Sequence, residues 1–194
     1  MDPVLQSEHV LLKNAFGKSF LDRTFQYPDG HSEQHLIYSI GATVTVFALV
    51  RSNPPQVLVV SEFKEGIGMR NTACIGARIR EGETPITAAK RRLLEETGYA
   101  PTPTPTPGVL SAVHLGAGPF MARSCADQVD VVLLLDCEMV ATPDSSASKG
   151  VEIKLFDPTM WYHIITNTRA VTDVHAVAAT LWAYEYLGWL KLAF

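Results

Sequence analysis

The chain has 194 residues, 47% of them hydrophobic, which is enough for one ordinary domain with a buried core. The formal net charge of −4 gives no electrostatic reason to expect nucleic acid or a membrane surface as a partner. The longest apolar runs, residues 44–50 and 129–135, are much shorter than the roughly 20 residues that span a bilayer. Residues 1–18 carry charges throughout and do not resemble a signal peptide, so we expect a cytoplasmic protein.

The cysteines and histidines do not indicate a metal site. Three cysteines, Cys74, Cys125 and Cys137, are an odd number without metal-ligand spacing. We therefore expect a reduced intracellular chain with partly buried thiols. The six histidines are dispersed along the sequence, which argues against a zinc site built from histidine.

The N-terminal part of the chain predicts a small hairpin. The first seven residues are expected to be frayed. Residues 20–27 alternate loosely, and the turn Pro28-Asp29-Gly30 then leads into a second strand over residues 35–40. We interpret residues 1–42 as a hairpin extension that serves as a flap or a dimerisation piece, ahead of a main domain over residues 43–194.

A second hairpin follows at the start of the main domain. Residues 43–50 form a strand of β-branched and aromatic side chains, and the proline turn at residues 52–55 leads to a return strand over residues 56–61. Glu62, Phe63 and Lys64 come next and open a loop that contains glycine, residues 65–70.

Local signals predict a helix over residues 86–97. Thr84 can act as the N-cap, Pro85 suits the first helical position, and Gly98 is a usual left-handed stop. One stripe of this helix is expected to pack on the core. It consists of Ile86, Ala89, Leu93 and Thr97.

Two adjacent carboxylates lie near the end of this helix. Glu95 and Glu96 are spaced i+3 and i+4 from residue 92, so the three positions project together from a neighbouring face. Adjacent carboxylates beside a turn suit hard divalent cations such as Mg²⁺, which bring phosphates with them. Composition alone favours an ordinary solvated helix end, and only the spacing described below argues for a site.

After the helix, the chain alternates between strands and connections. Proline and threonine alternate over residues 101–107, which predicts a stiff, extended spacer. We expect a strand over residues 108–114, a loop over residues 115–127, and a strand covered on both faces over residues 129–136.

The C-terminal part predicts an exposed loop over residues 141–150, a strand over residues 151–156 and a helix capped by Asp157 with Pro158 at its first position. A last helix is expected over residues 173–187. Its predicted packing face consists of Val174, Val177, Ala178, Leu181 and Tyr184.

Residues 77–99 resemble the Nudix box, G-x5-E-x7-R-E-U-x-E-E-x-G-U, where U is apolar. With Gly98 in register, the matching residues are Glu83, Arg91, Leu93, Glu95, Glu96 and Tyr99. The N-terminal hairpin and the Glu62-Phe63-Lys64 strand end are similar to those of ADP-ribose pyrophosphatases and related nucleoside-diphosphate-sugar hydrolases. The resemblance implies an α+β Nudix fold, a mixed β-sheet sandwiched between helices with an N-terminal β-hairpin extension.

The chain departs from the family pattern at the start of the box, in the stretch before it and at residue 92. Ala77 stands where the box opens with glycine, and residues 73–77 replace the E-x-P-A-G stretch that precedes the box. Arg92 stands where the family has a glutamate that is a principal metal ligand. An arginine one turn before Glu95 and Glu96 can pair with both and neutralise them. The box therefore favours the fold more strongly than the usual catalysis.

The resemblance implies hydrolysis of the diphosphate of a nucleotide sugar such as ADP-ribose, with Mg²⁺ or Mn²⁺ as cofactor, bound more weakly than usual if Arg92 neutralises the carboxylates. It also implies a homodimer formed through the N-terminal hairpin. The alternative is a catalytically impaired nucleotide-binding or interaction protein, because Arg92 replaces a ligand.

Roles for individual residues also follow from the resemblance. Glu95, Glu96 and the backbone carbonyl of Gly76 are candidate metal ligands; Asp127 is either a further ligand or a strand-start charge. Arg91 is expected to orient the carboxylates, and Glu83 to fix the turn. Glu152 is either the general base or a charge at the sheet edge. The candidate substrate-binding residues are Phe63, Lys64, Arg92 and Phe120.

Overall fold

A computed structural model describes residues 2–15, 17–102, 110–119, 122, 124–167 and 173–190. The contacts between residues divide the chain into two compact units. The first contains residues 1–43 and 117–129, and the second contains residues 44–116 and 130–194. The boundary near residue 42 between extension and main domain stays a prediction. Most of the proline-threonine spacer lies outside the described residues.

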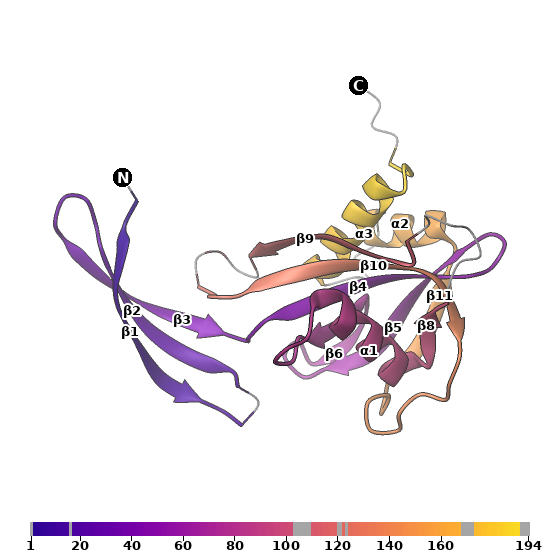
Figure 1. The fold of residues 1–194 in the computed structure, drawn as a ribbon, viewed down its shortest axis with the longest axis horizontal. Helices are drawn as coiled ribbons and strands as arrows, with labels where there is room; N and C mark the ends of the chain where they lie inside the picture. Colours follow the sequence, from indigo (N-terminus) through magenta and orange to yellow (C-terminus); the bar gives the residue numbers. More distant parts are fainter. Residues whose placement is uncertain are drawn as a thin grey trace. The chain divides into compact units, whose positions relative to one another are not determined.

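The first unit contains a three-stranded antiparallel sheet (Figure 1). Its strands, in spatial order, are β1 (Val4–Lys13), β2 (Ser19–Gln26) and β3 (Ser32–Ser39). The predicted hairpin is present as β2 and β3, and Gly30 in its turn has a φ of 90°. The prediction of a frayed start is wrong, because Val4 already pairs with Gln26 and the Arg23 Nε lies 2.6 Å from Glu8 Oε2.

The second unit is built around a sheet of eight strands. The strands β11, β5, β4, β10 and β8 neighbour one another in that order, while β6 pairs with β5, β7 with β4 and β9 with β10. The bounds are β4 (Thr43–Val50), β5 (Gln56–Lys64), β6 (Met69–Ala73), β7 (Ile75–Arg78), β8 (Tyr99–Pro101), β9 (Ala112–Pro119), β10 (Gln128–Met139) and β11 (Glu152–Phe156). The predicted hairpin of β4 and β5 is confirmed, with Ala48 opposite Leu58.

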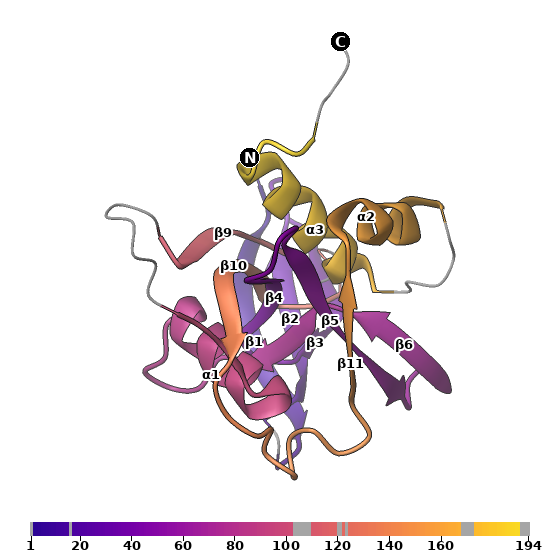
Figure 2. The same ribbon diagram turned by 90° about the vertical axis from the view of Figure 1, so that its right-hand side faces the viewer.

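Helices cover both faces of this sheet (Figure 2). They are α1 (Pro85–Thr97), α2 (Pro158–Asn167) and α3 (Val174–Tyr186). Helix α1 packs on the face that carries Val46 and Leu58, and α2 and α3 pack on the face that carries Phe47 and Val57. Successive strand residues point to opposite faces, so a continuous apolar strand such as β4 is buried on both sides. The predicted α+β fold, a sheet between helices, is confirmed.

Two local predictions need correction. The segment expected to be a loop from residue 115 begins as strand, because β9 runs to Pro119. The predicted packing face of α3 is correct only at Tyr184: Val174 is 70% exposed, and Val177, Ala178 and Leu181 are half-buried. The other buried residues are Ala176, Ala179, Thr180 and Ala183. Small side chains at i, i+3, i+4 and i+7 let the helix approach the sheet closely, whereas larger apolar side chains occupy other faces.

The three cysteines are free and buried, in agreement with the sequence analysis. Burial raises the pKa of the Cys74 thiol to about 12. In the part of the chain that the structure describes, no helix has both the length and the apolar character needed to cross a membrane.

Candidate functional site

Helix α1 begins and ends where its local sequence signals predict. Thr84 has extended backbone geometry, and its side-chain oxygen accepts a hydrogen bond of 3.2 Å from the Thr87 N–H. Gly98 ends the helix with a φ of 75° and donates its N–H to the Leu94 carbonyl. These two ends fix which side chains of α1 face the core and which are presented beside it.

The predicted core stripe of α1 is confirmed. Ala89, Leu93 and Thr97 are fully buried, and Ile86 packs partly buried against the same cluster. This places Arg91, Arg92, Glu95 and Glu96 on the neighbouring faces of the helix. Those four side chains form the candidate site.

Arg91 connects the turn before α1 to the helix itself. Its Nε lies 2.6 Å from Glu83 Oε1 and its Nη2 lies 2.8 Å from Glu83 Oε2, which is a bidentate pair. The Arg80 N–H also donates to Glu83 Oε2, over 2.8 Å. The hydrogen bonds from Arg91 and from the Arg80 backbone lower the pKa of Glu83 to about 2.

The same arginine holds the first carboxylate of the adjacent pair. Arg91 Nη1 lies 3.1 Å from Glu95 Oε2, and Arg91 Nη2 donates to the Arg78 carbonyl over 2.9 Å. Arg80 Nη2 approaches Glu95 Oε1 to 3.4 Å. The sequence analysis missed Arg78 and Arg80: Arg78 contributes its backbone carbonyl, and Arg80 lies just beyond the end of β7, so no sequence pattern indicated either contact.

Glu96 lies in a very different environment. Its side chain is only 2% exposed, and Arg92 Nε lies 3.1 Å from its Oε2. Burial raises the pKa of Glu96 to about 7, although the positive charges of Arg92 and Lys64 oppose the shift. The charges of Glu62 and Glu95 add to it. Glu62 was not among the predicted site residues, because only the folded chain brings it near Glu96.

Two of the predicted substrate-binding residues, Phe63 and Lys64, lie at the end of β5 and point to opposite faces of the sheet. Glu62 and Lys64 form an ion pair and follow Val60, whose side chain belongs to the core on the α1 side. Phe63 points to the opposite face by strand alternation and is 51% exposed. The structure thus brings Lys64, but not Phe63, to the side of the sheet that carries the α1 carboxylates.

The departures at residues 76 and 77 have little effect on the backbone. Gly76 and Ala77 lie in β7, and among the described residues only Asp136 combines a side chain with a positive φ. A side chain at Gly76 would meet open space, whereas Ala77 is buried against the α1 side of the core. In the turn between β7 and α1, the glycine with left-handed backbone geometry is Gly82, with a φ of 78°.

Among the described residues, Asp127 and Glu152 have hydrogen-bond or ion-pair partners other than the α1 side chains. Asp127, in the first unit, accepts hydrogen bonds from the N–H groups of Ile40 and Gly41, over 2.5 and 3.1 Å, and from Ser39 Oγ. Glu152 starts the edge strand β11, with its carboxylate 3.6 Å from Lys154 Nζ. Phe120 lies outside the described residues. The roles assigned to these three stay predictions.

The loop over residues 141–150 is attached to the carboxylate end of α1. The N–H groups of Val140 and Ala141 donate to the Gly98 carbonyl, and the Asp144 N–H donates to the Glu95 carbonyl over 2.8 Å. At its other end, Arg70 Nη2 donates to the Gly150 carbonyl over 3.1 Å. The loop is therefore held against the helix end and against the sheet.

A divalent cation does not fit these side chains as they are arranged. The carboxylate of Glu95 is paired with Arg91 and Arg80, and that of Glu96 is paired with Arg92. Across the described ranges, no group of three His, Cys, Asp or Glu side chains is placed to hold a metal ion. The oxygen donors are of the kind that Mg²⁺ and Mn²⁺ prefer, but guanidinium groups already neutralise them.

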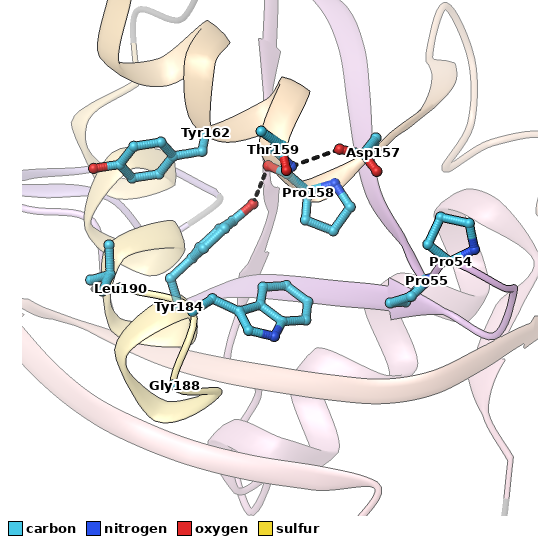
Figure 3. A pocket seen from close by; sticks show the side chains of 10 residues that line it. Pro54, Pro55, Asp157, Pro158, Thr159, Tyr162, Tyr184, Gly188 and Leu190 are labelled. Atoms are coloured by element: carbon cyan, nitrogen blue, oxygen red, sulfur yellow. Dashed lines mark hydrogen bonds between the residues drawn. The ribbon is translucent and has the colours of Figure 1, made fainter.

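A cavity of about 590 Å³ lies elsewhere in the second unit (Figure 3). It is lined by the turn between β4 and β5, the start of α2 and the end of α3, and its wall includes Tyr162, Tyr184 and Trp189. The Tyr184 hydroxyl donates to the Pro158 carbonyl over 2.6 Å. None of the predicted site residues that the structure describes in the second unit lines this cavity.

The chain was compared with curated proteins, with solved structures and with models of protein families. A search among curated proteins gives no match. A solved structure described as an ADP compounds hydrolase superposes with a TM-score of 0.78 over 97% of this chain and 95% of that chain, at 12% sequence identity. At this identity the likeness establishes the fold alone. The family described as NUDIX domain matches residues 41–163. That match covers more than half of the chain, so the chain belongs to the Nudix family, and this membership supports a hydrolase.

Proposed function

We propose that the protein hydrolyses the diphosphate of a nucleotide sugar such as ADP-ribose. The observation that carries the proposal is the arrangement on α1, where Arg91 holds Glu83 and Glu95 beside the buried Glu96. The structural neighbour supports the substrate class, since it is described as acting on ADP compounds. Water would attack one phosphorus and break the P–O bond between the two phosphates, so ADP-ribose would give AMP and ribose 5-phosphate.

The charges around α1 suit a phosphorylated substrate. Glu83 and Glu95 are balanced by Arg91 and Arg80, and Glu62 is paired with Lys64. Because each of these carboxylates has its own cation, an incoming diphosphate does not meet a field of unbalanced negative charge. Lys64 and Arg92 are the proposed phosphate contacts, Phe63 and Phe120 remain proposed stacking residues, and Glu152 remains the proposed general base.

The test is product release from ADP-ribose and a panel of nucleotide sugars, followed by chromatography of AMP and sugar phosphate. Each substrate is assayed with Mg²⁺, with Mn²⁺ and with EDTA, because the family resemblance predicts a divalent cation. We expect turnover in the wild type and its loss in Glu96→Gln, with the exposed-site variant Lys90→Gln unaffected. Turnover that is equal in wild type and Glu96→Gln would contradict the assignment of this site.

A second function is favoured by the Arg92–Glu96 ion pair. Because this pair neutralises one of the two adjacent carboxylates, the site could bind a nucleotide sugar without turning it over. In that case the wild type binds ADP-ribose but releases no product, and Arg92→Glu gains metal-dependent hydrolysis. The same assay therefore separates an enzyme from a nucleotide-binding protein.

We also propose a homodimer formed through the sheet of the first unit. One face of that sheet carries a cross-strand row in which Leu12 lies opposite Phe20 and Phe20 opposite Tyr38. Leu12 and the neighbouring Leu36 are each 62% exposed, and Phe20 is 41% exposed. A row of exposed apolar side chains on a small sheet supports a protein–protein contact.

A further inference from the structure

Arg91 and Arg92 are adjacent on α1 but use their donors very differently. Arg91 uses all three of its guanidinium nitrogens, on Glu83, Glu95 and the Arg78 carbonyl. Arg92 contacts Glu96 through Nε. Its terminal nitrogens Nη1 and Nη2 make no hydrogen bond to another residue in the described ranges. All three guanidinium nitrogens of Arg91 thus bond to the protein, whereas Nη1 and Nη2 of Arg92, the fork of its guanidinium, have no hydrogen-bond partner among the described residues.

The position of Arg92 makes this fork available. Its side chain is 27% exposed, whereas the carboxylate that it pairs with is almost completely buried. Burial of a carboxylate without a partner is costly, so the Nε contact with Glu96 holds the guanidinium in place at the protein surface. Lys64, whose charge also acts on Glu96, lies on the same side of the sheet and is 43% exposed at its side chain.

We propose that Arg92 is the resident cation of this site and binds a phosphate of the nucleotide diphosphate through Nη1 and Nη2, so that binding requires no divalent metal ion. This inference rests on the proposed function, because it takes the diphosphate as the ligand. Arg92 then has two roles at once: its Nε neutralises Glu96, and its fork faces the anion.

The chemistry of guanidinium supports both roles. The group is planar, always charged, and places two parallel N–H donors where two phosphate oxygens can accept them. A bound Mg²⁺ would need several oxygen ligands in octahedral geometry, whereas Glu96 is already neutralised and Glu95 is shared by Arg91 and Arg80. A fixed guanidinium therefore supplies at this site the positive charge that a metal ion would otherwise have to bring.

The first experiment measures binding of a non-hydrolysable ligand, α,β-methylene ADP-ribose, by calorimetry in EDTA. We expect the wild type to bind and Arg92→Gln to bind at least about tenfold more weakly, since hydrogen bonds to a charged group are lost. Arg92→Lys keeps the charge but not the fork, and so should lie between them. Lys90→Gln, which removes an exposed positive charge on the same helix, is the matched control and should bind as the wild type does.

The second experiment measures Mn²⁺ binding by electron paramagnetic resonance, without substrate. Replacing Arg92 by glutamate places a third carboxylate one turn from Glu95 and Glu96 and removes the competing cation. We expect Arg92→Glu to bind Mn²⁺ at least about tenfold more tightly than the wild type, as several negative oxygen ligands would. Lys90→Glu makes the same change of charge on the same helix, and it should leave Mn²⁺ binding at the wild-type level.

The outcomes separate this inference from the proposed activity. No binding of the analogue by the wild type in EDTA, or equal binding by wild type and Arg92→Gln, would overturn the role of Arg92 even if Mg²⁺-dependent hydrolysis is found. Equal Mn²⁺ binding in wild type and Arg92→Glu would also overturn it. Arginine-dependent binding without any product would support Arg92 while removing the hydrolase. Thermal unfolding of each variant tests whether it is folded. If Arg92→Gln does not fold, the comparison is made between the wild type and Arg92→Lys.

Discussion

Two glutamates of this site have pKa values shifted in opposite directions. Glu83 accepts hydrogen bonds from Arg91 and from the Arg80 backbone, which favour its charged form and lower its pKa to about 2. Glu96 is buried, which favours its neutral form and raises its pKa to about 7. The contrast shows that neighbouring carboxylates of one motif do not share one electrostatic role. Hydrogen bonds favour the charged form of Glu83, whereas burial of Glu96 opposes its charged form.

Replacing Glu83 by glutamine should make the stability of the protein less dependent on pH. The pKa of Glu83 is lower in the folded chain, about 2, than the ordinary value of 4.5, so its charged form stabilises the fold above pH 4.5. That contribution is lost as the pH falls from about 4.5 towards about 2. We expect Glu83→Gln to be less stable than the wild type at pH 7, with a smaller difference at pH 3. Urea unfolding of both proteins at pH 7 and at pH 3 measures the difference in their unfolding free energies.

The exposed Glu81 of the same turn provides the control for this comparison. Glu81→Gln should leave the difference between pH 7 and pH 3 close to that of the wild type. A Glu83→Gln protein that is destabilised equally at both pH values would show that the carboxylate charge is not what holds the turn.

At the residue scale, the sequence predicted the identity of the carboxylates but not their environments. The box spacing singled out Glu95 and Glu96 together, yet one is shared by two arginines and the other is buried. The charges that act on Glu96 include those of Glu62 and Lys64 in β5, which are more than thirty positions away along the chain. A local pattern contains no information on that contact.

At the scale of elements, α1 was predicted well because its boundaries are chemical signals. A threonine cap, a first-turn proline and a left-handed glycine each act within a few residues of the helix end. The packing face of α3 was harder to predict than the ends of α1, because apolar residues occur on nearly all faces of α3. Its packing face depended on side-chain size, which lets Ala179 and Ala183 rather than Val177 and Leu181 approach the sheet most closely.

The glycine at the end of α1 should be far less replaceable than the one before its start. Gly82 and Gly98 both have a positive φ, but a Cβ on Gly98 would lie 2.0 Å from the Ala141 carbonyl oxygen, whereas one on Gly82 would meet nothing within 4 Å. We expect Gly82→Ala to cost about 1 kcal/mol from backbone strain alone. Gly98→Ala should cost at least about 2 kcal/mol more, because the loop must move.

Chemical denaturation of the two variants measures this difference directly. Gly82→Ala is the matched control, because it changes the same residue type in the same backbone region without a steric clash. Similar unfolding free energies for both variants would mean that the contact between Gly98 and Ala141 does not constrain the loop.

At the scale of the whole molecule, the chain forms two compact units, and only part of this organisation was visible in the sequence. The hairpin of β2 and β3 was predicted from its turn, but β1 was not, because its polar and charged residues give no clear alternation. The contribution of residues 117–129 to the first unit was also missed, since sequence distance conceals the hydrogen bonds between Tyr38 and residues 124–126.

The exposed row on the first unit predicts how the protein associates. Placing a charge within the row, as in Leu12→Asp, should convert a dimer of the wild type into a monomer, since a carboxylate buried in an apolar contact is strongly unfavourable. Sedimentation velocity measures the change. Val174→Asp is the control, because Val174 is equally apolar and 70% exposed but lies on α3. A monomeric wild type, or dissociation by both substitutions, would contradict the proposed interface.

The attachment of the loop over residues 141–150 has a consequence for the diversification of this scaffold. Hydrogen bonds hold residues 140, 141 and 144 to the end of α1, and Arg70 holds Gly150. The side chains of Ser146 and Ser148 bond to Asp144 within the loop, and the Ser148 carbonyl accepts from the Val151 N–H rather than from α1. Residues 145–149 can therefore accept insertions or be exchanged between relatives without displacing Glu95. Such grafts would change what surrounds the end of α1, while the hydrogen bonds that hold the Glu95 backbone are kept.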